Sequence, residues 1–527
     1  MQSLILFIIG ISFLFGNLCF NEKVYAKNNP TVNNSEFYDE LSLDYANDFY
    51  KNFNYYDKNK MDLDFKAKAL ENYQKSKLIL LAAATCAGSY ASESENSEFN
   101  YLSDYGWKIY PLEAKEGKVK VKFTVAESKK DAKGNKLLVL AFRGSTTLKD
   151  WVYDLAASRV VFGGTNLDEF DNYTAMNARG EDKPKVHNGY NSYARAALRL
   201  TIDFENNGKK ERIVDILKKN KNVKMILTGH SLGGAVATIF AERLISMGVS
   251  KEQIPVITFG APAVGNKQFV KEYKDKINLI RVVTAKDPVP GAFQTFFSGY
   301  QQFGDKIKFD VSTLEFDFQH PIAIYVDFAY NNLEKAKDKA IATGAIAPRK
   351  YVKLDGTGPL IAVWINKVGD FEPRESTPEP NQIFYSELQH SLERYVFVNL
   401  DIDPSNDQKY DYLKMYNQAK AMGADYILYN EVGVFRFNHS DNFSMGICQI
   451  VFNKKGFGEE FFMSRTRITN NKLYVQSAIE LLRRSKRNLS EKYPWLEYKP
   501  LIEKIRVDKE ASWIKAGSNN NIITSTY

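Results

Sequence analysis

The residues around Ser231 have the types and spacing that a serine nucleophile requires. Ser231 lies in GHSLGG (229–234), which follows the apolar stretch VKMIL (223–227) and precedes an alanine-rich segment. Between a strand and a helix, G-x-S-x-G forms a sharp turn that exposes the serine oxygen, and its glycines avoid collisions with neighbouring elements. The pattern predicts that Ser231 attacks a carbonyl carbon and that the backbone N–H of Leu232 stabilises the resulting oxyanion.

A serine nucleophile of this type is followed in sequence first by an acid and then by a histidine base. Asp287 comes after the apolar stretch 279–284, in the loop AKDPVP, and is better placed there than Asp275 or Asp305. A carboxylate at the end of a strand can accept a hydrogen bond from the imidazole and fix its tautomer. We therefore predict Asp287 as the acid.

Three of the five histidines follow Asp287 and are candidates for the base. His390 is preferred, because it comes after a polar loop and opens HSLERYVFVNL, a stretch that we predict to be helical. His320, which precedes HPIAIYVDF at the predicted start of another helix, is nearly as good on local pattern and remains the alternative base. His439 is the third.

A second oxyanion donor is expected from the loop after an early central strand. The apolar stretch LLVLAF (137–142) ends in RGSTT, in which Ser145 can donate both its backbone N–H and its hydroxyl. With a base to take the Ser231 proton, this set of residues predicts acyl transfer through an acyl-enzyme.

The elements that must position these residues alternate between strand and helix. Short continuous apolar stretches indicate buried central strands, and the longer segments between them indicate helices. This order predicts an α/β fold with a central, mostly parallel sheet flanked by helices. The expected strands are 118–125, 136–142, 223–227, 254–259 and 279–284, and the expected helices are 75–90, 190–207, 233–247 and 322–342.

Six sequence blocks in order resemble the class 3 lipases, the fungal type of α/β hydrolase, over roughly residues 70–400. The blocks are AFRGS with DWVYDL (141–155), VHNGY (186–190), GHSLGG (229–234), TFGAP (258–262), DPVP (287–290) and HSLERY (390–395). The resemblance implies an α/β-hydrolase fold, a triad of Ser231, Asp287 and His390, and Ser145 as an oxyanion residue. It also implies a lid at about 147–157 that carries Trp151, although packing of Trp151 in the core fits its sequence context equally well.

The chain is expected to divide into four parts. They are a signal peptide (1–26), a leader (27–65), the lipase-like domain (66–400, with an insertion at about 306–382) and a small α/β module of unknown role (401–527). The apolar residues 4–20 and the VYA at 24–26 are typical of a secretory signal, although no lysine or arginine precedes them. A secreted or cell-envelope protein is therefore expected, with an uncleaved anchor as the alternative.

The cysteines, the charge and the absence of certain motifs limit the ligands and partners that we expect. Cys86 and Cys448 are two distant cysteines, which favours two buried thiols over a disulfide. The net charge of +8 is a mild excess, and a local +7 over 465–506 indicates a solvated helix face or, less strongly, peripheral contact with an anionic membrane. No zinc-type spacing or phosphate-binding glycine loop occurs, so no metal, cofactor or nucleic acid is expected.

These features together predict a secreted carboxylic ester hydrolase that acts on triacylglycerol or related lipid esters, with a lipid–water interface as a suitable site of action. A phospholipase A1 and a feruloyl-type esterase share the same acyl-transfer chemistry and remain alternatives. A different class of function, an envelope-associated binding protein on a hydrolase scaffold, is suggested by the C-terminal module.

Overall fold

The computed structural model describes residues 65–90, 107–116, 119–128, 130, 134–145, 158–202, 208–296, 299–309, 319–369, 377–398, 412–436, 443–469 and 472–496. The chain forms two compact units, which meet in the sequence between Ile346 and Ala347. Each unit has its own sheet.

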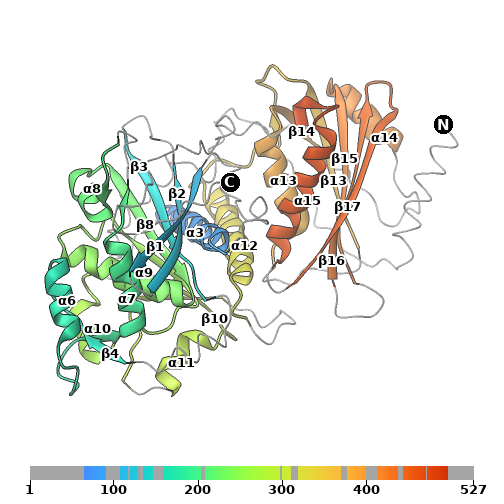
Figure 1. Ribbon diagram of the computed structural model, residues 1–527. Coiled ribbons are helices and arrows are strands. Elements are labelled where there is room, and N and C mark those ends of the chain that lie inside the picture. The colour runs from blue at the N-terminus through green and yellow to red at the C-terminus, as the bar shows by residue number, and fades with distance from the viewer. Residues whose placement is uncertain are drawn as a thin grey trace. The chain divides into compact units, whose positions relative to one another are not determined.

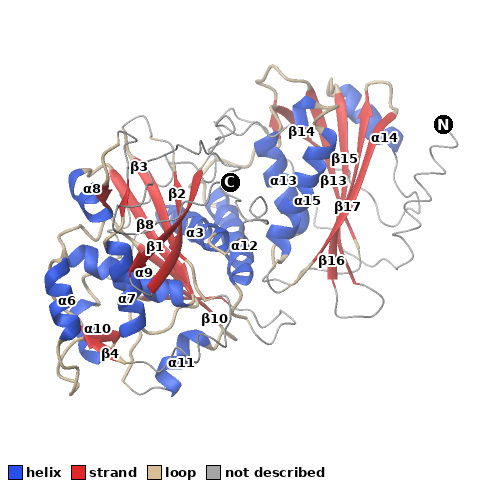
Figure 2. Cartoon of the chain, viewed as in Figure 1, coloured by secondary structure: helices blue, strands red, loops and turns tan. Residues whose placement is uncertain are grey.

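A seven-stranded sheet forms the centre of the first unit (Figures 1 and 2). Its last five strands are parallel, and the two at the β1 edge are antiparallel. The predicted α/β fold with a mostly parallel sheet is confirmed. In spatial order the strands are β1 (Lys108–Glu116), β2 (Val119–Glu127), β3 (Lys136–Phe142), β8 (Val223–His230), β9 (Val256–Phe259), β10 (Leu279–Thr284) and β11 (Asp305–Phe309).

Helices cover both faces of this sheet. Leu138, Leu140 and Phe142 of β3 share one core with the apolar side chains of α9, while Thr228 of β8 meets the Cys86 thiol of α3 at 3.3 Å on the other face. The helices are α3 (Phe65–Gly88), α6 (Leu167–Ala175), α7 (Asn188–Leu198), α8 (Ile213–Lys219), α9 (Leu232–Ser246), α10 (Lys267–Tyr273), α11 (Val289–Phe296) and α12 (Ile322–Ala342). Short ladders join β4 (Arg159–Val161) to β5 (Lys185–His187) and β6 (Thr201–Ile202) to β7 (Glu211–Arg212).

The helices α3 and α12 pack side by side although more than 230 residues separate them in sequence (Figure 1). The Asn332 amide of α12 donates to the Ser76 hydroxyl of α3 at 2.8 Å. The predicted helix at 322–342 has the predicted bounds, whereas the one predicted at 75–90 begins ten residues earlier. This helix pair supports the sheet face next to Thr228.

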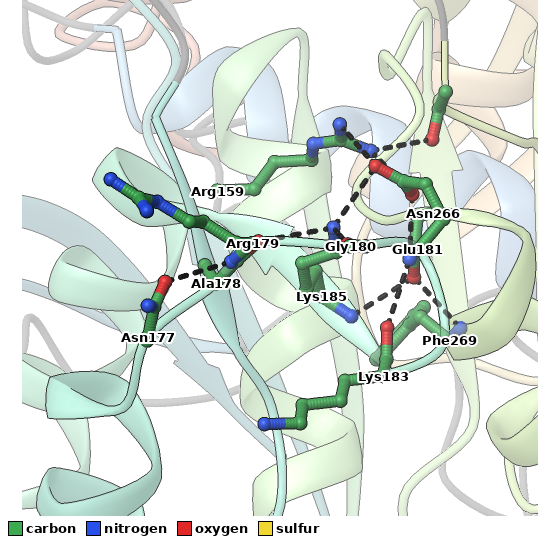
Figure 3. A network of polar contacts seen from close by, with 11 residues as sticks. Arg159, Asn177, Ala178, Arg179, Gly180, Glu181, Lys183, Lys185, Asn266 and Phe269 are labelled. Carbon is green, nitrogen blue, oxygen red and sulfur yellow. Dashed lines mark hydrogen bonds and ion pairs between the residues drawn. The ribbon is translucent and has the colours of Figure 1, made fainter.

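A network of polar contacts ties three loops of the first unit together (Figure 3). The buried ammonium of Lys185 donates to the Gly180 carbonyl and to the Glu181 carboxylate, the latter at 3.0 Å. Arg159 pairs with Glu181 at 2.7 Å and donates to the Gly299 carbonyl at 3.2 Å. The Asn266 amide also donates to Glu181, so the loops before β5 and after β9 are held to the start of β4.

The second unit is built on a six-stranded mixed sheet. Helix α14 covers one face, where Met415 and Ala419 share a core with Trp364 and Tyr429. On the other face, the Ser485 hydroxyl of α15 donates to the buried Gln449. In spatial order the strands are β12 (Val352–Lys353), β14 (Arg394–Phe397), β13 (Leu360–Val368), β15 (Tyr426–Arg436), β16 (Phe443–Asn453) and β17 (Gly458–Arg467), and the helices are α13 (Pro380–Ser391), α14 (Tyr412–Ala421), α15 (Tyr474–Leu489) and the 3-10 helix η3 (Pro494–Leu496).

The predicted domain boundary at residue 401 is wrong. Strand β13 pairs in parallel with both β14 and β15, so the segment before residue 401 is part of the second sheet. The predicted insertion at 306–382 is likewise divided, because α12 belongs to the first unit and β13 to the second. The sheet fixes the boundary, because removing β13 would break its ladders to both neighbours.

The two cysteines in the described part of the chain are unbridged. Cys86 and Cys448 are both buried, which confirms the prediction of two separate thiols. Burial raises the pKa of each thiol to about 12. Because the thiolate is the reactive form, both cysteines are expected to be inert.

Candidate active site

Ser231 is the turn between β8 and α9, as the sequence predicts. Its backbone has φ 58° and ψ −130°, and it is the one non-glycine residue at positive φ in the described part of the chain. Such a conformation costs about 1–3 kcal/mol and persists only where its surroundings enforce it. Here the Ser231 N–H donates to the Phe259 carbonyl of β9 at 2.9 Å, and the Ser231 carbonyl accepts from Gly234 N–H at 3.0 Å.

The glycines on both sides of Ser231 are required by packing. A Cβ on Gly229 would lie 2.2 Å from the backbone carbon of Gly233. A Cβ on Gly233 would lie 2.0 Å from the Phe142 carbonyl oxygen at the end of β3. Both contacts are with backbone atoms, so the helix can approach the strands this closely only with glycine at these positions.

The loop after β3 lies against Ser231. A Cβ on Gly144 would be 3.2 Å from the Ser231 Cβ and 2.6 Å from the His230 carbonyl oxygen. Ser145 is the next residue and is half-buried, as is Leu232 at the start of α9. The loop predicted to supply an oxyanion donor is therefore brought to the predicted nucleophile.

Asp287 follows β10, and three donors converge on its buried carboxylate. His320 Nδ1 lies 2.9 Å from Oδ2, the Tyr325 hydroxyl donates to Oδ2 at 2.5 Å, and the Val289 N–H donates to Oδ1 at 2.9 Å. The side chain of Asp287 is completely buried, and that of His320 is 7% exposed. Because the Asp287 carboxylate accepts from Nδ1, the other ring nitrogen of a neutral His320 is left as an acceptor.

Tyr325 was not predicted to belong to this site. It lies in the first turns of α12, five residues after His320, and its ring is fully buried. Burial raises the pKa of Tyr325 well above its usual value, and the negative charge of Asp287 raises it further. Tyr325 therefore stays protonated and serves as a hydrogen-bond donor to the carboxylate.

The predicted pairing of Asp287 with His390 is wrong, and the alternative histidine, His320, is the partner of Asp287. His390 is near the end of α13, within the second unit, and does not open a helix. The residues after it form β14, and Leu392 and Tyr395 are buried in the second unit. The apolar pattern of HSLERYVFV thus reflects strand and core packing in that unit.

The chain's relation to known proteins follows from its central segment. The family model of "Lipase (class 3)" matches residues 139–297, which include Ser145, Ser231 and Asp287. This segment matches the class 3 lipases. The matched segment ends before His320, so the partner of Asp287 comes from outside it.

Several known proteins are similar to parts of this chain. Phospholipase A1-II 1 of rice (Oryza sativa subsp. indica) is 27% identical over 195 residues, which are 34% of this chain and 45% of the rice protein. A triacylglycerol lipase of Ricinus communis is 26% identical over 245 residues, or 41% of this chain and 45% of that protein. The solved triacylglyceride lipase of Rhizomucor miehei is 20% identical with a TM-score of 0.34, covering 45% of this chain and 80% of that one. The chain thus spans less than half the length of the two curated relatives.

Some predicted features fall outside the described residues. They are the signal segment 1–26, the leader up to residue 64, the lid segment 147–157 with Trp151, and His439. Within the described ranges, no cluster of three or more histidine, cysteine or acidic side chains could hold a metal ion. In the same ranges, no helix is long and apolar enough to span a membrane.

Proposed function

We propose that this protein is a carboxylic ester hydrolase that acts on lipid esters through Ser231, His320 and Asp287. The observation that carries the proposal is the Asp287–His320 pair, which adjoins the strained elbow at Ser231. His320 reaches the elbow through its carbonyl oxygen, which lies 2.7 Å from Nε2 of His230, the residue before Ser231. These contacts support the assignment of Ser231, Asp287 and His320 to one active site.

In the proposed reaction, His320 Nε2 takes the proton of the Ser231 hydroxyl as Oγ attacks the ester carbonyl carbon. Asp287 accepts the Nδ1–H bond and stabilises the imidazolium that forms. The tetrahedral oxyanion is stabilised by Leu232 N–H and by Ser145, and each donor contributes about 3 kcal/mol. The imidazolium then protonates the leaving alcohol, and water, deprotonated by His320, releases the acid from the acyl-enzyme.

The substrate class is supported by the relatives, which are named as phospholipases A1 and triacylglycerol lipases. We propose a lipid ester rather than an aromatic polysaccharide ester on that basis. Release of fatty acid from emulsified triacylglycerol and from phosphatidylcholine, each compared with methyl ferulate, decides among the three substrates. Rates measured above and below the solubility limit of the ester test whether a lipid–water interface is preferred.

Export from the cytoplasm is part of the proposal and is supported by the apolar stretch 4–20 followed by VYA at 24–26. The expected mature protein begins at Lys27. Amino-terminal sequencing of the protein from the medium or the cell envelope tests this, and an intact Met1 would favour the uncleaved anchor.

The central experiment compares hydrolysis of p-nitrophenyl esters by the wild type and by Ser231→Ala. We expect the variant to lose at least about 1000-fold in kcat. His320→Ala is expected to lose a similar factor, whereas His390→Ala, the matched histidine deletion in the second unit, retains wild-type turnover. Equal background rates from the wild type and Ser231→Ala would contradict an enzymatic function and favour a binding protein on a hydrolase scaffold.

A further inference from the structure

His230, the residue before Ser231, makes a directional contact with the proposed base. Its side chain is buried, and its Nε2 lies 2.7 Å from the His320 carbonyl oxygen. A carbonyl oxygen can only accept a hydrogen bond, so Nε2 must carry the proton. The two rings also contact each other, with centroids 4.5 Å apart. His230 is therefore fixed in one tautomer against the backbone of His320.

The other ring nitrogen of His230 contacts Tyr90, which lies beside the loop after β3. Its Nδ1 lies 2.8 Å from the Tyr90 hydroxyl, and in this tautomer Nδ1 must accept a hydrogen bond from that hydroxyl. The Tyr90 hydroxyl also lies against Gly144, where an added Cβ would come within 2.1 Å of it, and the Arg143 guanidinium lies 5.7 Å from the centre of the Tyr90 ring. Tyr90 thus donates to His230, and His230 donates to the His320 carbonyl.

We propose that Tyr90 and His230 are positioning residues, because their two hydrogen bonds and the packing of Tyr90 against Gly144 tie the oxyanion loop to the backbone of His320. The proposal rests on the proposed function. It assigns a role to Tyr90, which follows α3 and lies outside the segment that matches the lipase family. Three segments distant in sequence are thereby held together beside Ser231.

The electrostatic surroundings favour this arrangement. Burial lowers the pKa of His230 well below its usual value, and the neighbouring His320 lowers it further. Burial raises the pKa of Tyr90. Both groups are therefore neutral, as the chain requires, because a protonated His230 would place an N–H against the Tyr90 hydroxyl.

The expected effect is on the transition state rather than on substrate binding. Ser145 follows Gly144, so a displaced loop would misplace an oxyanion donor, and a shifted His320 would misplace the base. Small displacements of such groups reduce the rate of the chemical step by roughly 10- to 100-fold. A group that acts only on the transition state lowers kcat and leaves KM nearly unchanged.

The test uses the full-length protein and the variants Tyr90→Phe, His230→Gln and their combination. Tyr90→Phe removes the hydroxyl that contacts His230 and Gly144, while His230→Gln keeps an amide donor for the His320 carbonyl. We expect Tyr90→Phe to lower kcat about 10-fold or more with unchanged KM, and the double variant to be no worse than the more impaired single variant. Tyr416→Phe is the matched control, since it loses a 2.6 Å hydrogen bond to the Lys454 carbonyl in the second unit.

A structural readout accompanies the kinetics. NMR of isotope-labelled histidine is expected to show His230 as the Nε2–H tautomer with a proton protected from exchange, and Tyr90→Phe should shift that signal. A folded Tyr90→Phe with wild-type kcat would overturn the positioning role and leave the proposed function intact. Wild-type activity no higher than that of Ser231→Ala would instead overturn the proposed function, and the positioning role with it.

Discussion

At the scale of single residues, the elbow at Ser231 depends on glycines more than on any side-chain contact. The Cβ positions of Gly229 and Gly233 are occupied by backbone atoms at 2.2 and 2.0 Å. Backbone cannot move aside as a flexible side chain can, so these positions set how closely α9 approaches β3 and β8. The same close approach enforces the positive φ of Ser231.

Gly233→Ala is therefore expected to destabilise the first unit by about 3 kcal/mol or more, because the new methyl group overlaps the Phe142 carbonyl. The matched control is Gly291→Ala in α11, where an added Cβ would meet no atom within 4 Å and alanine is the better helix former by about 1 kcal/mol. Urea unfolding followed by circular dichroism measures both variants. Equal midpoints for the two would contradict the steric argument.

Glu242 in α9 gives a second prediction for a single residue. It is buried, neither carboxylate oxygen has a hydrogen-bond partner within the described structure, and burial raises its pKa to about 8. Between pH 4.5 and 8 the unfolded chain ionises this group and the folded protein does not. The contribution of Glu242 to the free energy of unfolding is therefore fully present below pH 4.5. It falls as the pH rises toward 8, by at most about 1.4 kcal/mol per pH unit.

Glu242→Gln removes this titration. The variant is expected to gain stability over the wild type as the pH rises from 5 to 8, and the exposed Glu491→Gln serves as control. Free energies of unfolding in urea at pH 5, 6.5 and 8 give the difference directly, and other titrating groups cancel in the comparison. A difference that stays constant with pH would show that Glu242 is already ionised in the folded protein.

At the scale of elements, the network around Lys185 contains buried contacts of Lys185 and exposed contacts of Glu181, which should differ in strength (Figure 3). The Lys185 side chain is 2% exposed and satisfies backbone carbonyls, whereas that of Glu181 is 59% exposed. Lys185→Met is expected to cost about 2 kcal/mol, because buried carbonyls lose their donor. Glu181→Gln should cost less than about 1 kcal/mol, since exposed ion pairs contribute little. Urea unfolding of both variants tests this order, and the reverse order would refute it.

The elements also show which parts of the fold can be predicted from local sequence patterns. The continuous apolar stretches of β3 and β10 and the helix α12 have the predicted bounds, because burial on both faces or a long uninterrupted helix leaves a clear local pattern. The stretch RYVF was predicted as helix and is β14, since a short apolar run fits either state. Its pairing with β13 makes this stretch a strand, and such pairing cannot be read from the local sequence.

The same limit explains the choice of histidine. Ser231 and Asp287 were predictable because each follows its own strand directly. His320 meets Asp287 just before α12, a helix that packs against α3 although the two helices are far apart in sequence. The motif around His390 resembled the lipase pattern, and this local resemblance favoured the wrong histidine.

At the scale of the whole molecule, two sheets with separate cores divide the chain at Ile346 and Ala347. All six strands of the second sheet lie within 352–467, and none pairs with a strand of the first sheet. Trp364, Tyr429 and Ile450 belong to a core that α14 completes from within the same unit. A segment with its own sheet, covering helices and core has what independent folding requires.

We therefore expect Ala347–Lys499, produced alone, to fold and to unfold cooperatively in urea. Because the proposed triad lies entirely before Ile346, the complementary fragment ending there should hydrolyse a soluble p-nitrophenyl ester with kcat within about 3-fold of the full chain. If the boundary were at residue 400, a fragment starting at 401 would fold cooperatively. In the structure that fragment lacks β13 and β14, which leaves one side of β15 unpaired. Far-ultraviolet circular dichroism of the fragments starting at 347 and at 401 decides between them, and equal cooperativity in both would contradict the boundary seen in the structure.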